Sequence, residues 1–184
     1  MLAYVFWHWP LAGTDPVLYE RRLRSFHQAL AAARPAGFLR SSAYSLRGAS
    51  WVAAEAGYED WYLLEGSTAL DVLNDAAIAP PSRAPHDEAA ACAAGGCAGL
   101  YRLRAGAPAI EQAPVGYWLA KPPGVTYDDF YARLGPLTSQ AETGLWGRQM
   151  TLGPTPEFCL RSPAAVDLPD GCKAIRTELA RVWP

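Results

Sequence analysis

The sequence lacks the features that mark several large classes of protein. No uninterrupted apolar run approaches the roughly 20 residues that a membrane helix needs. The first residues show neither the basic region nor the small-residue cleavage site of a signal peptide. Neither a GxGxxG nor a P-loop motif is present, so nothing indicates a nucleotide-binding fold. We therefore expect a cytoplasmic protein with no membrane partner.

Positive charge and metal-binding side chains are also sparse. The net charge is -2 and the sixteen basic residues are scattered, which argues against a nucleic-acid partner. Cys92 and Cys97 are separated by four residues, and no second Cys or His pair completes a zinc site. With Cys159 and Cys172, they fit reduced, buried, small apolar residues rather than a disulfide framework. We expect no metal held by protein side chains.

Aromatic residues, in contrast, are abundant. The 184 residues include seven Trp and nine Tyr, and 51% of the chain is hydrophobic. A chain of this size suits one large domain or two fused small ones. The aromatic side chains either fill the core and a subunit interface or form a pocket for an aromatic molecule. Composition alone leaves both interpretations open.

The stretch from residue 2 to residue 37 predicts a strand followed by a helix. Residues 2–9 are aromatic and β-branched on both faces, which is typical of a strand covered on both sides. Thr14 or Asp15 caps a helix that has Pro16 in its first position, and Pro35 and Gly37 end it. The apolar residues recur at helical spacing: Tyr19, Leu23, Phe26 and Leu30.

The chain then predicts further elements in a ferredoxin-like order. Strands are expected at 38–46, 58–64 and 99–103, and helices at 67–77 and 85–94. The resulting order is β-α-β-β-α-β over residues 1–105. A linker rich in small residues and proline at 106–115 is the domain boundary, and 116–184 form the second unit.

The second unit is a weaker copy of the first. Tyr117-Trp118 matches Phe6-Trp7, and strands follow near 144–152 and 157–161. Repetition predicts a short helix around 164–168 and a final strand at 173–183, although the spacing of the final segment also suits a helix. We therefore predict an α+β fold in which two tandem ferredoxin-like repeats pack their antiparallel sheets into a barrel.

This tandem arrangement resembles the dimeric α+β barrel superfamily, whose members place helices outside two facing sheets and a cavity between them. About the first 100 residues are most similar to the EthD-like group. The likeness rests on Asp15-Pro16, Tyr19 and the aromatic–His step Phe26-His27, followed by the Pro35/Gly37 exit. Gln28-Ala29 departs from the group, in which a Pro often follows the His by two positions.

The resemblance implies a fold more than a reaction. The superfamily includes decarboxylase-like and monooxygenase-like members. Some relatives bind haem, but no residue of this chain specifically demands it, so a cofactor-free protein is expected with haem as the alternative.

Three histidines are candidates for chemistry. His8 lies mid-strand; if its face points into the cavity between the sheets, it acts as a general base or binds a ligand, and otherwise it is a hydrogen-bonded core residue. His27 is placed at the edge of the helix–sheet contact; it is either an amphipathic boundary residue or, as the resemblance implies, a second catalytic residue. His86 begins a helix and is either a ligand contact or an exposed residue of the first turn.

Further polar and aromatic residues are candidates for ligand binding. Strand alternation and proximity to His8 predict that these residues line the cavity or, alternatively, lie on a solvated sheet edge. The candidates are Tyr4, Phe6, Arg40, Tyr44, Asp60, Tyr62 and Arg148. Arg148 also suits a cross-strand ion pair with Glu157.

The sequence thus predicts binding of a small hydrophobic or aromatic molecule, with proton transfer by His8 or His27. The alternative is a non-catalytic binding or assembly module, a homodimer, whose aromatic residues form the core and the dimer interface.

Overall fold

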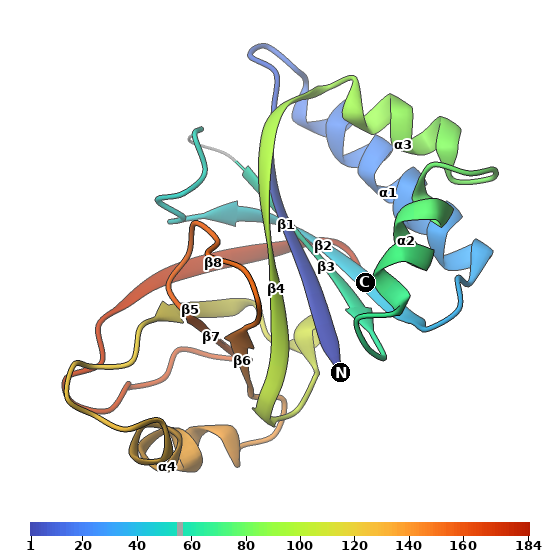
Figure 1. Ribbon diagram of the computed structural model, residues 1–184. Helices are drawn as coiled ribbons and strands as arrows, with labels where there is room; N and C mark the ends of the chain where they lie inside the picture. The colour runs from blue at the N-terminus through green and yellow to red at the C-terminus, as the bar shows by residue number, and fades with distance from the viewer. Residues whose placement is uncertain (55–56) are drawn as a thin grey trace.

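A closed antiparallel barrel lies at the centre of the computed structural model, which describes residues 1–54 and 57–184 (Figure 1). The strands of the described chain are β1 Leu2–Pro10, β2 Phe38–Arg47, β3 Gly57–Leu64, β4 Ala93–Gly106, β5 Val115–Leu119, β6 Gly144–Arg148, β7 Phe158–Ser162 and β8 Ala174–Trp183. Their order around the barrel is β1-β3-β2-β8-β5-β7-β6-β4. Each half of the chain contributes one run of neighbouring strands, so the predicted α+β fold with two duplicated units is confirmed.

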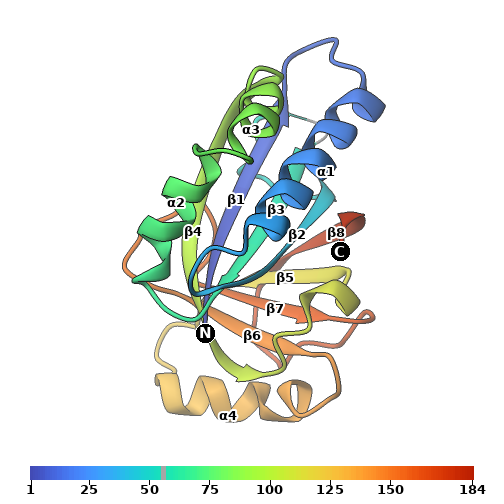
Figure 2. The same ribbon diagram turned by 90° about the vertical axis from the view of Figure 1, so that its right-hand side faces the viewer.

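The helices cover the two halves unequally. Helices α1 (Pro16–Ala33), α2 (Ala69–Ala77) and α3 (Arg83–Ala90) lie over the first half, whereas α4 (Tyr127–Thr138) lies at the opposite end of the molecule over the second (Figures 1 and 2). The prediction of a short helix at 164–168 is wrong, because those described residues form bends and irregular chain. The final strand is confirmed as β8, which pairs with both β2 and β5 and thereby joins the two sheets.

Local sequence determines where α1 begins and ends. The Asp15 side chain accepts a hydrogen bond from the backbone N–H of Val17, and Pro16 occupies the first turn, where a missing N–H is harmless. The helix ends at Arg34 in a left-handed conformation with φ 47°. Between these ends, the apolar stripe and His27 face the sheet and are buried.

The interior of the barrel is filled with aromatic side chains, contrary to the cavity that the resemblance implied there. Trp7, Trp61, Trp118 and Trp146 are fully buried, and their rings meet edge to face at distances such as 5.2 Å between Trp7 and Trp118. Such contacts add to the stabilisation that burial of large rings already provides. The tryptophans therefore form core rather than a ligand pocket.

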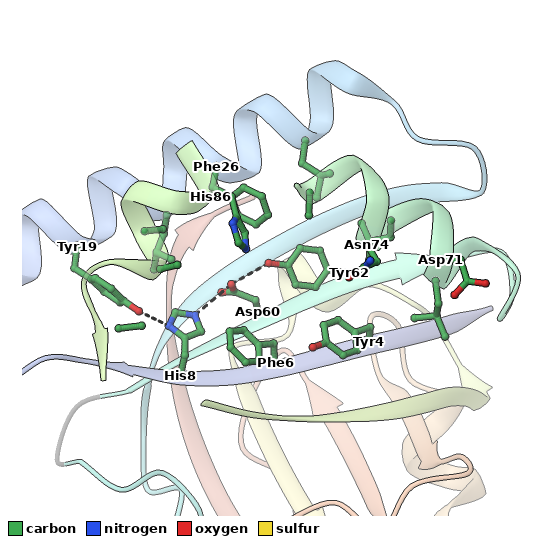
Figure 3. A pocket seen from close by; sticks show the side chains of 18 residues that line it. Tyr4, Phe6, His8, Tyr19, Phe26, Asp60, Tyr62, Asp71, Asn74 and His86 are labelled. Carbon is green, nitrogen blue, oxygen red and sulfur yellow. Dashed lines mark hydrogen bonds and ion pairs between the residues drawn. The ribbon is translucent and has the colours of Figure 1, made fainter. Parts of the chain in front are cut away.

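Strand β1 divides its side chains between this interior and the helices. Val5 and Trp7 belong to the interior cluster. Tyr4, Phe6 and His8 point to the opposite face, beneath the helices, because side chains alternate along a strand (Figure 3). The condition that these three side chains face the space between the sheets is therefore not met, although both faces of the strand are covered as expected.

Other sequence-based exclusions can be checked on the described residues alone. None of the described helices is long and apolar enough to cross a membrane. The described part of the chain contains no grouping of three or more His, Cys, Asp or Glu residues arranged to hold a metal ion. All four cysteines are free; Cys159 is buried, and the other three are partly exposed.

Candidate functional site

A cavity of about 580 Å³ lies between the outer face of the first sheet and helices α1–α3 (Figure 3). Most of its lining is apolar, with a few polar groups at the sheet. The lining residues are Tyr4, Phe6, His8, Tyr19, Leu23, Phe26, Leu30, Asp60, Tyr62, Leu70, Asp71, Leu73, Asn74, Ala77, His86, Ala89, Ala90 and Ala93. An apolar cavity with a few convergent polar groups is the usual form of a small-molecule site.

The pairing of β1 with β3 brings the polar groups of the sheet together. In the antiparallel register, Phe6 lies opposite Asp60 and Tyr4 lies opposite Tyr62. His8 is two residues from Phe6 on the same face, so its ring reaches Asp60 diagonally across the two strands (Figure 3). Segments that are far apart in the sequence thus form one continuous patch.

Asp60 is the centre of a buried cluster of polar side chains. Its Oδ2 atom lies 3.2 Å from Nε2 of His8 and 3.2 Å from Nε2 of His27. The Tyr62 hydroxyl donates a hydrogen bond to the same oxygen at 3.1 Å. The exposed fractions of Asp60, His8 and His27 are 2%, 2% and 0%. A carboxylate this deeply buried is stable only because several donors converge on it.

Each imidazole is held from its other side by a hydroxyl. His8 Nδ1 lies 2.7 Å from the Tyr19 hydroxyl, and His27 Nδ1 lies 2.8 Å from Oγ of Ser41. Because both Nε2 atoms face a carboxylate, we assign the ring protons to Nε2. Tyr19 and Ser41 then donate their hydroxyl protons to Nδ1. The cluster is therefore two chains, Tyr19–His8–Asp60 and Ser41–His27–Asp60.

The cluster shifts the pKa values of its acidic groups in opposite directions. Burial alone raises the pKa of Asp60, but the two imidazoles and their hydrogen bonds outweigh burial and hold this pKa below its ordinary value. Burial and then the nearby Asp60 charge raise the pKa of Tyr62 well above normal, and the same two causes raise that of Tyr19. Asp60 is thus a carboxylate and both tyrosines keep their protons at neutral pH.

His27 is deeper than the sequence predicted. Its ring lies parallel to Tyr62, with 5.3 Å between centroids, and to Trp183, with 6.3 Å between centroids. The expectation of a boundary position at the edge of the helix–sheet contact is therefore wrong. His27 belongs to the cluster through Asp60 but does not line the cavity itself.

The remaining candidates fall in different parts of the molecule. His86 lines the cavity with a side chain that is 36% exposed, and its Nδ1 lies 3.1 Å from an Asp87 carboxylate oxygen. Tyr44 faces the barrel interior and donates to the carbonyl of Ile110. Asp60 and Tyr62, in contrast, face the helices. A single cavity lined by Arg40, Tyr44, Asp60 and Tyr62 is therefore not formed.

Two arginine candidates make local contacts away from the cavity. Arg40 pairs with Glu111 and donates to the carbonyl of Pro108. Arg148 donates to the carbonyl of Thr155 at 2.7 Å. The predicted ion pair of Arg148 with Glu157 is absent from the described contacts; the Glu157 side chain instead accepts from the Tyr127 hydroxyl.

Sequence reasoning missed Tyr19 and Ser41 as members of the site. Tyr19 was placed in the apolar stripe of the helix, where its ring does pack, and nothing in the pattern revealed its hydroxyl contact with His8. Ser41 alternates with Arg40 along β2 and so points toward His27. Only the pairing of distant strands and helices identifies these contacts.

Comparison with known proteins locates the fold. The sequence matches no protein-family model and none of the curated protein sequences. The crystal structure of a candidate chlorite dismutase designated TA0507 superposes with a TM-score of 0.51 and 11% identity, over 99% of this chain and 96% of the other. The likeness shows the fold. This fold is the duplicated ferredoxin-like α+β barrel that the tandem pattern predicted. The likeness does not test the finer assignment to the EthD-like group.

A haem held by histidine requires an imidazole nitrogen free for iron. Both nitrogens of His8 face other groups, as do both nitrogens of His27, so these two residues do not fit an axial role. His86 is the cavity imidazole whose Nε2 no described side chain contacts. A haem site in this cavity would therefore depend on His86.

Proposed function

We propose that this protein binds a small, largely apolar molecule in the cavity under α1–α3 and transfers a proton on it without a cofactor. The observation that supports this most strongly is the buried His8–Asp60–His27 cluster in the wall of an apolar cavity. A histidine cluster that only stabilises a core has no need of such a cavity beside it. The Phe26-His27 step supports an EthD-like assignment, since it supplies one of the two imidazoles.

The lining indicates the charge of the ligand. It includes the carboxylates of Asp60 and Asp71, and no Lys or Arg is present among the described lining residues. An anionic ligand would enter without a cationic partner, which is unfavourable in an apolar cavity. Aromatic rings such as Phe6 and Phe26 attract both apolar and cationic groups. We therefore propose a neutral or cationic ligand with an aromatic or apolar body.

The Tyr19–His8–Asp60 chain provides a route for proton abstraction. Tyr19 lines the cavity, and its hydroxyl oxygen is the point at which the chain meets a bound molecule. A substrate proton passes to this oxygen while the hydroxyl proton of Tyr19 passes to Nδ1 of His8. The resulting imidazolium is stabilised by the Asp60 carboxylate 3.2 Å away, and the reverse steps return the proton.

Ligand-observed NMR against matched aromatic amines, phenols and carboxylates tests the binding proposal. Amines and phenols should bind, and carboxylates should not. Ala77→Phe fills the cavity without touching the cluster and should abolish binding, whereas Ala32→Phe on the exposed face of α1 should leave binding unchanged. Equal binding of the carboxylates, or unchanged binding by Ala77→Phe, would contradict the proposal.

The alternative is a non-catalytic binding or assembly module. It predicts that His8→Ala and His27→Ala lower stability without altering ligand affinity. It also predicts a homodimer, which native mass spectrometry of the purified protein detects together with any retained small molecule. The buried position of the four barrel tryptophans supports a core role for them rather than an interface role.

Haem is the second candidate, on the basis of His86 and of the resemblance to the dimeric α+β barrel superfamily, some members of which bind haem. Titration with haem should produce a Soret band that His86→Ala removes and His8→Gln retains. Absence of the band in the wild-type protein would eliminate this candidate.

A further inference from the structure

A second cavity of about 500 Å³ opens on the surface beside β2 and the end of β8. Its lining includes Ser41, Arg34, Arg40, Glu111 and Trp183. Ser41 is the residue whose hydroxyl bonds to Nδ1 of His27, and it is 3% exposed. His27 therefore connects the two cavities: its Nε2 atom faces Asp60 in the wall of the first, and its Nδ1 atom faces Ser41 in the wall of the second.

The packing around His27 holds its ring in the orientation that this bridge requires. Tyr62 lies against the ring at an interplanar angle of 16°, and Trp183 lies nearly parallel to it at 19°. Rings stacked on an imidazole leave its edge free, so both nitrogens point sideways toward hydrogen-bonding groups. The ring is 0% exposed, and protons therefore reach it through Asp60 or Ser41 rather than directly from water.

We propose that Asp60, His27 and Ser41 form a proton relay between the ligand cavity and the second cavity. A hydronium in the second cavity gives a proton to Oγ of Ser41 and becomes water. The original hydroxyl proton of Ser41 moves to Nδ1 of His27, and the Nε2 proton of His27 moves to Asp60. The proton then rests on Asp60, which is transiently the neutral carboxylic acid and passes the proton to the bound molecule, while Ser41 and His27 remain neutral. The reverse sequence carries a proton outward and restores the starting tautomer.

A relay of this kind matters most when the first cavity is occupied. A ligand that fills the first cavity excludes water from the Tyr19–His8 side. Any reaction with a net gain or loss of a proton then needs another route to solvent. The usefulness of the relay rests on the proposed proton-transfer function, but the chain of contacts from Asp60 through His27 to Ser41 is present without a ligand and can be measured without one.

The groups that face this chain are few. Asp60 and the Tyr62 hydroxyl lie at its inner end, and His8 shares the Asp60 oxygen. At the outer end, Arg40 is paired with Glu111, and Arg34 completes the charged lining of the second cavity. The outer end thus shares its cavity with charged side chains, and the inner end carries the Asp60 carboxylate.

The test is the exchange rate of the His27 Nε2 proton with water, measured by NMR on protein with ¹⁵N-labelled histidine. Ser41→Ala removes the outer link and should slow this exchange by about tenfold or more, as expected from loss of one hydrogen-bonded step. The His8 Nε2 proton exchanges through Tyr19 and should keep its rate in the same sample. Ser42→Ala is the matched control, since Ser42 is also buried on β2 but does not contact His27.

A His27 exchange rate in Ser41→Ala within twofold of the wild-type rate would overturn the relay, as would equal slowing by Ser42→Ala. If Ser41→Ala does not fold, the isosteric pair Ser41→Thr and Ser41→Val gives the same answer: the first keeps the hydroxyl and should exchange rapidly, and the second should not. Failure of the relay leaves ligand binding in the first cavity unaffected, so the NMR binding assay separates the two proposals.

Discussion

Two adjacent residues of β3 place carboxylates in two very different interiors. Glu59 points into the barrel, and Asp60 points toward the helices; both are buried. The Glu59 carboxylate accepts hydrogen bonds from the indole N–H of Trp7 at 2.8 Å and of Trp61 at 2.6 Å, and it pairs with Arg161 at 3.2 Å. Asp60 has no permanent cation among its described contacts and is paired with two titratable imidazoles.

This contrast distinguishes a structural carboxylate from a candidate functional one. Arg161 also donates to the carbonyl of Ala113 and lies over the rings of Tyr44 and Trp61 at 4.9 and 5.1 Å. Glu59 and Arg161 therefore link the two repeats through a packed core, away from any described cavity. The Asp60 cluster borders a cavity, and protons can be redistributed within it.

The largest effect is expected from removing the partner of Glu59. Arg161→Met leaves a fully buried carboxylate without its cation and should lower the free energy of unfolding by about 3–5 kcal/mol. Urea denaturation followed by tryptophan fluorescence measures this. The double variant Glu59→Gln/Arg161→Met should recover at least about 1 kcal/mol, because no charge then remains unpaired. A loss below about 1 kcal/mol in the single variant would show that the pair is not a structural link.

The two carboxylates should also give opposite pH dependences. Asp60→Asn should cost about 2–3 kcal/mol near pH 7, as expected for hydrogen bonds to a charged group. Because the pKa of Asp60 is lowered in the folded protein, the stabilisation by its carboxylate is present above the unfolded pKa of about 3.9 and is lost as the pH falls further. The stability difference between wild type and Asp60→Asn should therefore shrink in acid.

Glu59→Gln should change stability with the opposite pH dependence. Burial raises the pKa of Glu59, and Arg161 with the two indole hydrogen bonds offsets burial only in part. The contribution of Glu59 to the free energy of unfolding is therefore fully present below the unfolded pKa of about 4.3 and declines as the pH rises. The difference between wild type and Glu59→Gln should grow in acid. Parallel slopes for the two variants between pH 3 and pH 7 would contradict the assignment of the two environments.

The smallest effect is expected from Tyr19→Phe, which removes one hydroxyl from the cluster. The loss of its hydrogen bond to His8 should cost about 1 kcal/mol. Histidine ¹⁵N spectra should show a changed Nδ1 shift for His8 and an unchanged one for His27. Tyr4→Phe removes a hydroxyl from the same cavity without a described contact to His8 and serves as the control. An unaltered His8 spectrum in Tyr19→Phe would remove Tyr19 from the proton chain.

The two repeats also differ in the layer between their helices and their sheet. In the second repeat, Phe130 and Leu134 of α4 pack on an apolar sheet face that includes Leu145 and Phe158. This layer is a conventional apolar core, whereas the equivalent layer of the first repeat contains the cavity and the cluster. The two repeats therefore share a fold, whereas the His8–Asp60–His27 cluster lies in the first repeat.

The sequence by itself predicted the order of elements in the first repeat and which residues share a face of a strand. Strand alternation correctly grouped Asp60 with Tyr62, and capping residues placed the start of α1, because both signals depend only on neighbouring residues. β8 was predicted in another way, because the second repeat was expected to end in a strand as the first does. The choice of His8 and His27 as a pair came from residue type and resemblance, and their role in catalysis stays a prediction.

Only the tertiary structure decided which face of each strand meets which layer. Alternation says that Trp7 and His8 point in opposite directions, but it does not say which direction is the barrel interior, since both faces are apolar. The contacts of Asp60 with His8 and His27, and of His27 with Ser41, join three strands and a helix. Such contacts depend on strand register and helix packing over long sequence separations, and local pattern carries no information about them.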